Sequence, residues 1–331
     1  MIYDLLTQRK QELDKCRPLP DSLIQNLDNW FRIELTYTSN ALEGNTLNRQ
    51  ETALVVEKGL TVGGKSLREH LEARNHAEAL DWIQSLTKKK PSSLLENDIL
   101  YLHSLILKGI DDVNSGCYRS VPVRISGSAV ILPNPRKVSD LMVEFMEWIH
   151  HTSIHPVQFA ADAHYQLVTI HPFIDGNGRT ARLLMNLILM MYGYPPAIIR
   201  KQDRLSYIKA LEKAQLGGSK DDYYKLIAKA VDRSLYIYLK ASKGENEREA
   251  PEKLVKLLKI GELAKTVQET VPTIRHWTKE GLLEIADITP SGYQLYLPEM
   301  AERIKKLKEL KTKRLTLNEI KQKLINRRNL D

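Results

Sequence analysis

The stretch HPFIDGNGRTARLLMNLILMM, residues 171–191, decides how the chain is organised. Its second half carries apolar residues at helical spacing, and Gly193-Tyr194-Pro195-Pro196 ends the helix that this spacing predicts. The Gly-Asn-Gly turn at 176–178 therefore lies at a helix N-terminus, where unpaired backbone N–H groups attract anions. The stretch predicts a helix whose first turn receives a phosphate group.

The side chains around this turn suit a nucleotide phosphate site. Arg179 and Arg182 are three residues apart, so they share a helix face and can clamp phosphate oxygens. Asp175 precedes the turn and can hold a divalent metal on those oxygens. His171 also precedes it and can accept a proton from an incoming nucleophile. Each feature alone is more often structural, but together, at these offsets, they favour a phosphate site with a general base.

The segment resembles the signature of the Fic family, HPFx[DE]GNGRxxR, at every fixed position from His171 to Arg182. The resemblance implies transfer of AMP from ATP to a hydroxyl of a protein target. The roles in that family carry over by position: general base His171, Mg²⁺ ligand Asp175, anion cradle Gly176, Asn177 and Gly178, and outer-phosphate ligands Arg179 and Arg182.

Composition and charge bound the class of protein. With 331 residues, 42% hydrophobic and 27% charged, the chain is long enough for two or three soluble domains. Its 2 cysteines are far apart, which argues against a disulfide scaffold or zinc ribbon and fits a reducing compartment. The charged N-terminus and the absence of a long unbroken apolar run lead us to expect a cytoplasmic protein with no membrane partner. Residues 251–331 carry +6 of the net charge of +8, as a nucleic-acid-binding module or a solvated lysine-rich helix would.

A second informative segment, TYTSNALEGNTL at 36–47, precedes the core motif. Ser39 and Glu43 are spaced i,i+4 on a short predicted helix that Gly44 can cap, and ordinary helix-surface chemistry is one interpretation. Beside the core motif, the segment is similar to the Fic inhibitory signature [ST]xxxE[GN]. The resemblance implies that Glu43 pairs with Arg182 and occupies the space of the ATP γ-phosphate, which would make the chain an autoinhibited enzyme.

Residues 121–132, VPVRISGSAVIL, alternate at period two on either side of a Ser-Gly-Ser turn, which predicts a β-hairpin. A small structural hairpin is one interpretation. In the resembled family a hairpin at this place is the flap that holds an extended target segment by strand addition. The flap residues would be Val121, Val123, Ile125 and Gly127.

Aromatic and histidine residues near the core motif have two interpretations each. Tyr207, in a later helix, is either a core residue or, as the resemblance implies, part of the adenine pocket. His164 is expected to pack behind the active-site loop. A zinc site is the alternative for the histidines, but their spacing does not place three ligands on one face: His150, His151, His155, His164 and His171.

After Leu257 the pattern changes to that of a small module. Residues 260–264 and 271–277 predict two short helices with a tight connection. Residues 283–296 predict a hairpin wing that turns at Ser291-Gly292, and 298–313 an amphipathic helix. The spacing IGELA…TIRHW…GLL…GYQLY resembles the MerR-type winged helix-turn-helix. The resemblance implies duplex DNA binding, with four candidate contacts: Thr273, Arg275, His276 and Lys279. Gln294 stands where that family usually has arginine, so a peptide-binding or regulatory module is the alternative.

The chain is thus expected to be mostly α-helical, with a Fic-type helical core, a β-hairpin flap and a small winged helix-turn-helix domain. The expected divisions are an N-terminal helical region at 1–90 with the inhibitory helix near 36–45, a catalytic core at 91–240, a linker at 241–252 and the winged module at 253–331. The expected ligands are ATP and Mg²⁺, and the expected partner is a protein with a Ser, Thr or Tyr hydroxyl. Self-modification and a homodimer are left open. The alternatives are removal of AMP with Glu43 orienting a water, a nucleotide-sensing DNA-binding regulator, and a different phosphate-containing donor.

Overall fold

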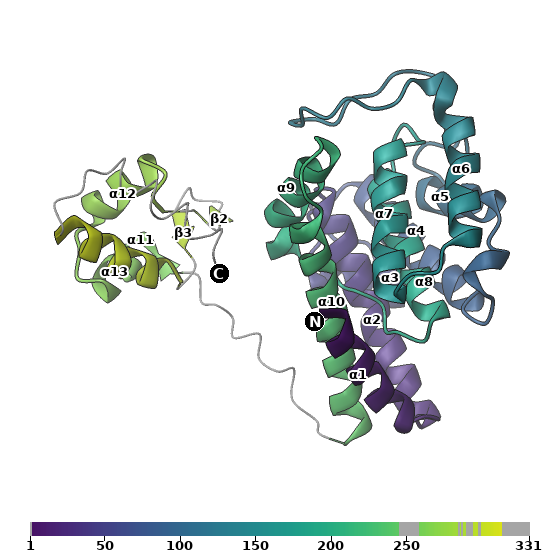
Figure 1. Cartoon of the computed structure of the whole chain (residues 1–331), viewed down its shortest axis with the longest axis horizontal. Helices are drawn as coiled ribbons and strands as arrows, with labels where there is room; N and C mark the ends of the chain where they lie inside the picture. The colour runs from purple at the N-terminus through teal and green to yellow at the C-terminus, as the bar shows by residue number, and fades with distance from the viewer. Residues whose placement is uncertain are drawn as a thin grey trace. The chain divides into compact units, whose positions relative to one another are not determined.

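The computed structural model describes residues 2–244, 258–283, 285, 287–288, 294–296 and 299–312. The chain divides into two compact units, Met1–Glu245 and Asn246–Asp331 (Figure 1). In the described part, the first unit contains α1 (Ile2–Lys15), α2 (Asp21–Leu42), α3 (Arg49–Lys58), α4 (Leu67–Ser85), α5 (Glu96–Leu107), α6 (Val138–His151), α7 (Pro156–Ile170), α8 (Asn177–Met191), α9 (Arg204–Gln215) and α10 (Asp221–Ser242). Short 3₁₀ turns join some of these helices: η1 (Pro91–Ser93), η2 (Pro135–Lys137) and η3 (Lys201–Asp203). The prediction of a mostly helical fold is confirmed.

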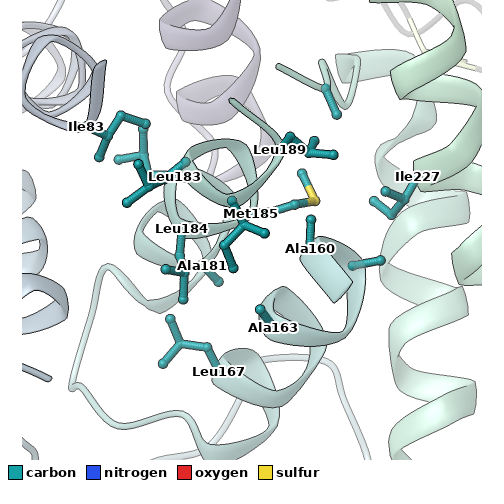
Figure 2. Close-up of a cluster of buried hydrophobic side chains, with 14 of the residues drawn as sticks. Ile83, Ala160, Ala163, Leu167, Ala181, Leu183, Leu184, Met185, Leu189 and Ile227 are labelled. Atoms are coloured by element: carbon teal, nitrogen blue, oxygen red, sulfur yellow. The ribbon is translucent and has the colours of Figure 1, made fainter. Parts of the chain in front are cut away.

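Helix α8 lies in the core of the first unit because it is apolar on nearly every side. The predicted apolar stripe is buried, and its neighbours on the helix are buried with it. Helix α7 packs against α8 through Ala160 and Ala163, whose small side chains let the two helices approach closely. Figure 2 shows this cluster, which also includes Ile83 of α4 and Ile227 of α10. The start of α8 is therefore held by the core on which the unit is built.

The N-terminal helices belong to the same unit as the core motif. Helix α1 packs along α10, where Arg9 forms an ion pair with Asp232 (2.6 Å). The prediction that Ser39 and Glu43 lie on a short separate helix is wrong, because α2 runs without a break from Asp21 to Leu42. From Leu27 to the end of the helix, its buried apolar residues recur at helical spacing: Leu27, Phe31, Leu35 and Leu42. None of the helices in the described ranges is both long and apolar enough to cross a bilayer.

The predicted β-hairpin at 121–132 is also wrong, because these residues form no strand. Figure 1 shows the segment as a long loop that runs out and back before α6. The predicted turn is present at residues 126–127, where the Ser128 N–H donates to the Ile125 carbonyl (3.2 Å). Beyond this bond, the two arms make no backbone hydrogen bonds to each other in the described chain. Pro122 contributes no N–H group to a ladder, which is one reason that pairing does not begin here.

The second unit has the predicted winged arrangement. Helices α11 (Ile260–Thr266), α12 (Val271–Lys279) and α13 (Glu299–Thr312) pack with a sheet of β1 (Leu258–Lys259), β2 (Asp287–Ile288) and β3 (Gln294–Tyr296). The strand order is β1-β3-β2, both pairs are antiparallel, and β2 and β3 are the predicted wing. The core of the unit includes Leu263, Ile274, Trp277, Tyr296, Ile304 and Leu307. The predicted wing turn at Ser291-Gly292 and most of the predicted linker lie outside the described residues.

Candidate active site

His171 ends α7 in a left-handed backbone conformation (φ 52°, ψ 58°) that turns the chain away from the helix. Its Nδ1 lies 3.3 Å from the Val168 carbonyl, a position from which an Nδ1–H group donates and Nε2 keeps its lone pair. Nε2 makes no hydrogen bond to any described residue. Burial lowers the pKa of His171, so the imidazole is neutral near pH 7. The side chain therefore has the protonation state that a general base requires.

Asn177 and His103 fix the loop between α7 and α8. The buried Asn177 amide donates to the Phe173 carbonyl and accepts from the Phe173 N–H, both at 2.9 Å. His103 stacks on the Phe173 ring (3.6 Å between centroids). The Gly116 N–H must donate to His103 Nδ1 (3.0 Å), so Nε2 carries the proton and donates to the Asp175 carbonyl (3.0 Å). Burial lowers the pKa of His103 to about 4, which keeps this brace neutral.

The predicted anion cradle lies at the N-terminus of α8. Gly176 has φ 77°, and a Cβ there would lie 3.2 Å from the His103 ring, so both backbone angle and space favour glycine. A Cβ on Gly178 would collide with the Glu43 carboxylate. That carboxylate therefore lies against the first turn of α8, where an anion is most favoured.

Arg182 is buried and points toward the end of α2. Its guanidinium donates to the Ser39 hydroxyl (2.9 Å), the Ser39 carbonyl (2.9 Å) and the Glu43 carboxylate (2.6 Å). Glu43 follows the last residue of α2, so the end of that helix presents both groups to Arg182. The structure thus brings Glu43 and Arg182 together, as the resemblance implied, and Ser39 contacts the same guanidinium.

Arg179 is also buried, but it contacts a different pair of carboxylates. Its guanidinium lies 3.4 Å from Glu72 of α4 and 3.4 Å from Asp175, and its Nε has no partner in the described chain. The other oxygen of Asp175 accepts from Arg68 (2.7 Å). Both arginines of the motif therefore face carboxylates of the chain itself.

Asp175 is the residue that could hold a metal ion. Its side chain is 46% exposed and ionisable, and Mg²⁺ is commonly held by one or two carboxylates together with substrate phosphates. Within the described ranges there is no group of three His, Cys, Asp or Glu side chains that could hold a metal on its own. Asp175 thus fits a Mg²⁺ ion shared with a nucleotide, provided that Arg68 moves aside, and the zinc alternative gains no support.

Tyr207 and His164 support Arg182 from behind. The Tyr223 hydroxyl donates to the Ala161 carbonyl (2.8 Å), so it accepts from His164 Nδ1 (2.8 Å). His164 Nε2 then accepts from the Tyr207 hydroxyl (2.7 Å), and Tyr207 in turn interacts with Arg182. Burial lowers the pKa of His164 to about 3. His164 is packed behind the site as expected. Tyr207 is buried as well, and its place in an adenine pocket stays a prediction.

Arg119 is a site residue that sequence reasoning missed. The side chain is buried, and its guanidinium donates to the carbonyls of His171 (2.8 Å), Pro133 (2.7 Å) and Val121 (3.3 Å). Its backbone N–H donates to the Pro172 carbonyl (2.9 Å). Arg119 therefore ties both ends of the flap to the loop that carries His171. No spacing in the sequence indicates this role, and the same holds for His103 and Glu72.

The flap residues and the candidate DNA contacts are mostly accessible. Val121 and Gly127 are exposed, whereas Val123 and Ile125 are half-buried. On α12, the side chains of Arg275, His276 and Lys279 are exposed, and Thr273 is half-buried beside Thr270 (2.8 Å between hydroxyls). Gln294, which stands where the MerR family usually has arginine, accepts a hydrogen bond from the Tyr296 hydroxyl (2.8 Å). This side chain therefore makes a contact within the wing.

Two parts of the chain match family models, and several known proteins are similar to it. Residues 93–189 match the model of the Fic/DOC family, and residues 258–326 match that of the MerR HTH family regulatory proteins. The protein adenylyltransferase Fic of Nematostella vectensis is 41% identical over 206 residues, which cover 61% of this chain and 48% of that protein. The protein adenylyltransferase Fic of Aedes aegypti is 36% identical over 255 residues, which cover 76% and 48%. The chain spans about half the length of these curated relatives.

Two solved structures are similar to most of this chain. A Fic domain containing signaling protein from Bacteroides thetaiotaomicron has 30% identity and a TM-score of 0.67, and the match covers 73% of this chain and 99% of that one. Fic-1 from C. elegans has 32% identity and a TM-score of 0.67, and the match covers 74% of each chain. With the complete motif at the start of α8 and these relatives, the chain belongs to the Fic family, and its residues 258–326 are similar to the MerR HTH family.

Proposed function

We propose that this chain transfers AMP from ATP to a Ser, Thr or Tyr hydroxyl of a protein. The observation that carries the proposal is a neutral histidine next to a helix N-terminus with two buried arginines. The relatives named protein adenylyltransferase Fic support it. This arrangement supplies a base for the nucleophile and positive charge for a polyphosphate leaving group in one place.

In the proposed reaction, His171 Nε2 accepts the proton of the target hydroxyl as its oxygen attacks the α-phosphorus of ATP. The bond between the α-phosphorus and the bridging oxygen breaks, and pyrophosphate leaves with the electron pair. The backbone amides at the start of α8 and the guanidinium groups of Arg179 and Arg182 hold the charge of the leaving group. A Mg²⁺ ion held by Asp175 and the nucleotide would neutralise part of the phosphate charge when bound. Asn177 contributes by holding the loop through Phe173.

The proposal includes autoinhibition by Glu43. Its carboxylate contacts Arg182 (2.6 Å) and lies against Gly178, in the place where phosphate oxygens would meet the first turn of α8. Two anions cannot share this position, so Glu43 and the outer phosphates of ATP compete for it. The wild-type chain is therefore expected to transfer AMP slowly.

The test uses ATP labelled at the α-phosphate, with Mg²⁺, and compares wild type with Glu43→Gly, Glu43→Gln and Glu43→Gly/His171→Ala. Each variant is incubated alone and with a cell extract. Label on protein in Glu43→Gly, less in Glu43→Gln and none in the double variant is the expected result. Label on the chain itself would identify self-modification. No label in any variant, with ATP binding demonstrated, would overturn the proposal and favour a nucleotide sensor.

Further substrates distinguish AMP transfer from two related reactions, which are removal of AMP and transfer from a different donor. Faster loss of AMP from a modified protein in wild type than in Glu43→Gly would favour removal of AMP, with Glu43 orienting a water. Label delivered from another nucleotide at a higher rate than from ATP would favour a different donor. Both outcomes keep His171 and the α8 N-terminus as the site.

A second candidate function is duplex DNA binding by the C-terminal unit, supported by the MerR family match and by the exposed α12 side chains. Affinity for duplex DNA should fall with salt, with a slope of about −0.9 per phosphate contact. Lys279→Ala should weaken binding, whereas Lys305→Ala, on α13, is the matched control. Comparison of one half-site with two would report a homodimer. Absence of salt-dependent binding by the full chain would favour a protein-docking role.

A further inference from the structure

Glu212 of α9 holds the tip of the flap. Its carboxylate accepts hydrogen bonds from the Ser128 hydroxyl (2.7 Å) and the Ala129 N–H (2.9 Å). The Ser128 hydroxyl oxygen accepts in turn from the Val130 N–H (3.2 Å), so three consecutive flap residues are fixed from one side chain. Hydrogen bonds from Ser128 and then Ala129 hold the pKa of Glu212 below its usual range, so the group is ionised near pH 7.

The arm that precedes the tip has unpaired backbone groups. In the part of the chain that the structure describes, the N–H groups of Val123, Arg124 and Ile125 have no hydrogen-bond partner. Ile131 on the return arm is 94% exposed and Val121 is 48% exposed. Unpaired backbone and exposed apolar side chains on an extended segment are what an added strand requires.

The flap is therefore fixed at two places and open between them. Its root is held by the buried Arg119, which also contacts the His171 carbonyl (2.8 Å), and its tip is held by Glu212. Without a ladder between the arms, these two contacts supply the hydrogen bonds that hold the flap to the rest of the unit in the described chain. A target segment that pairs with this arm is positioned relative to His171 through the same contacts.

We propose that Glu212 is a positioning residue for the protein substrate, which holds the flap in the conformation that receives an extended target segment. The inference rests on the proposed AMP transfer for its functional part. Glu212 lies at the flap tip and does not touch the reacting atoms, so its removal should alter the use of the protein substrate while leaving nucleotide binding unchanged.

Hydrogen exchange of the full chain provides a readout that does not depend on activity. Glu212→Ala should speed exchange of the Ala129 amide about tenfold, because its acceptor is lost, and leave α7 and α8 unchanged. Glu212→Gln keeps an acceptor oxygen and should exchange at nearly the wild-type rate. Lys209→Ala, an exposed residue on the same helix, is the matched control. Unchanged exchange at Ala129 in Glu212→Ala would overturn the contact.

The functional part is tested in the Glu43→Gly background with labelled ATP and increasing amounts of cell extract. Glu212→Ala should lower transfer to extract proteins about tenfold at low extract concentration, with an unchanged Kd for ATP, and Glu212→Gln should restore most of it. Faster exchange of the Ala129 amide in Glu212→Ala, together with unaltered AMP transfer to extract proteins, would overturn the positioning role. If Glu43→Gly itself transfers no AMP, the proposed function fails, whereas the exchange result still decides whether Glu212 holds the flap.

Discussion

The loop that carries His171 and the flap differ in how they are held, although neither forms regular secondary structure. The loop at 171–176 is braced from three sides by buried groups: Asn177, His103 and Arg119. The flap at 121–132 is held at its root by Arg119 and at its tip by Glu212, and its arms are unpaired between these points. The first loop must keep a base in one place, whereas the second must leave its backbone available to a partner. The difference predicts that changes in the first loop affect stability and catalysis together, and that changes in the flap affect only the use of the target.

The largest expected effect is that of His171→Ala on AMP transfer. Loss of the base should lower the rate about 10²–10⁴-fold in the Glu43→Gly background, with an unchanged Kd for ATP. His151→Ala removes an exposed histidine from α6 and is the control. Initial rates with labelled ATP measure both. A His171→Ala variant that transfers AMP at the parental rate would remove the base from the proposed reaction.

The next effect concerns acid stability. Because the folded-state pKa of His103 is about 4 and its ordinary value is 6.5, the unfolded state binds more protons between these two pH values. Stability is therefore retained above pH 6.5 and falls as the pH drops toward 4, by about 3 kcal/mol for this one group. Urea unfolding of His103→Gln should show a shallower pH dependence in that window than wild type. Parallel curves would mean that His103 is not a buried neutral group.

Much of the braced loop could be predicted from the sequence, because its groups lie within one short stretch. The Gly176 turn, the motif arginines and the start of α8 follow from local spacing. The Glu43–Arg182 contact joins residues 139 positions apart, so only the resemblance indicated it. His103 and Arg119 come from elsewhere in the chain and have no local pattern that indicates a role at the site.

For the flap, by contrast, the sequence pattern led to a wrong prediction, because the expected β-hairpin does not form. Alternation at period two reports that successive side chains face opposite sides, and this is satisfied by an extended loop as well as by a strand. Whether a strand forms depends on backbone pairing, which the sequence of one segment does not specify. Here the backbone near Pro122 and Ala129 is held by Arg119 and Glu212, and the arms stay unpaired.

Asn177 and Asn186 of α8 form a matched pair that tests whether the brace of the His171 loop matters for catalysis. Asn177→Ala leaves the Phe173 N–H and carbonyl without partners in a buried place and should cost about 2 kcal/mol of stability. Asn186, later on the same helix α8, makes the same paired contact with the backbone of Ala197 (2.8 and 3.3 Å). Both alanine variants should lower Tm by a similar amount, but only Asn177→Ala should slow AMP transfer. Equal loss of transfer in both would show that the loop has no special dependence on its brace.

The pH dependence of transfer should report the environment of His171. Burial lowers its pKa below 6.5, so the neutral form predominates above that pH and the acid limb of kcat/KM begins below it. The rate should fall about tenfold per pH unit on that limb. Arg119 also lowers this pKa, so Arg119→Gln should move the limb toward higher pH. An acid limb centred above 6.5 in the parent would contradict a buried neutral base.

The smallest expected effect on stability is that of Ile131→Ser in the flap. The side chain is 94% exposed, so its replacement should change the free energy of unfolding by less than about 0.5 kcal/mol. Transfer to extract proteins should nevertheless fall, because an extended target segment loses an apolar contact, while the Kd for ATP stays the same. Val113→Ser, at a residue 86% exposed outside the flap, is the control for general surface effects. If the two variants transfer AMP equally well, the exposed apolar residues of the flap do not contact the target, and strand addition must rely on the backbone of the open arm alone.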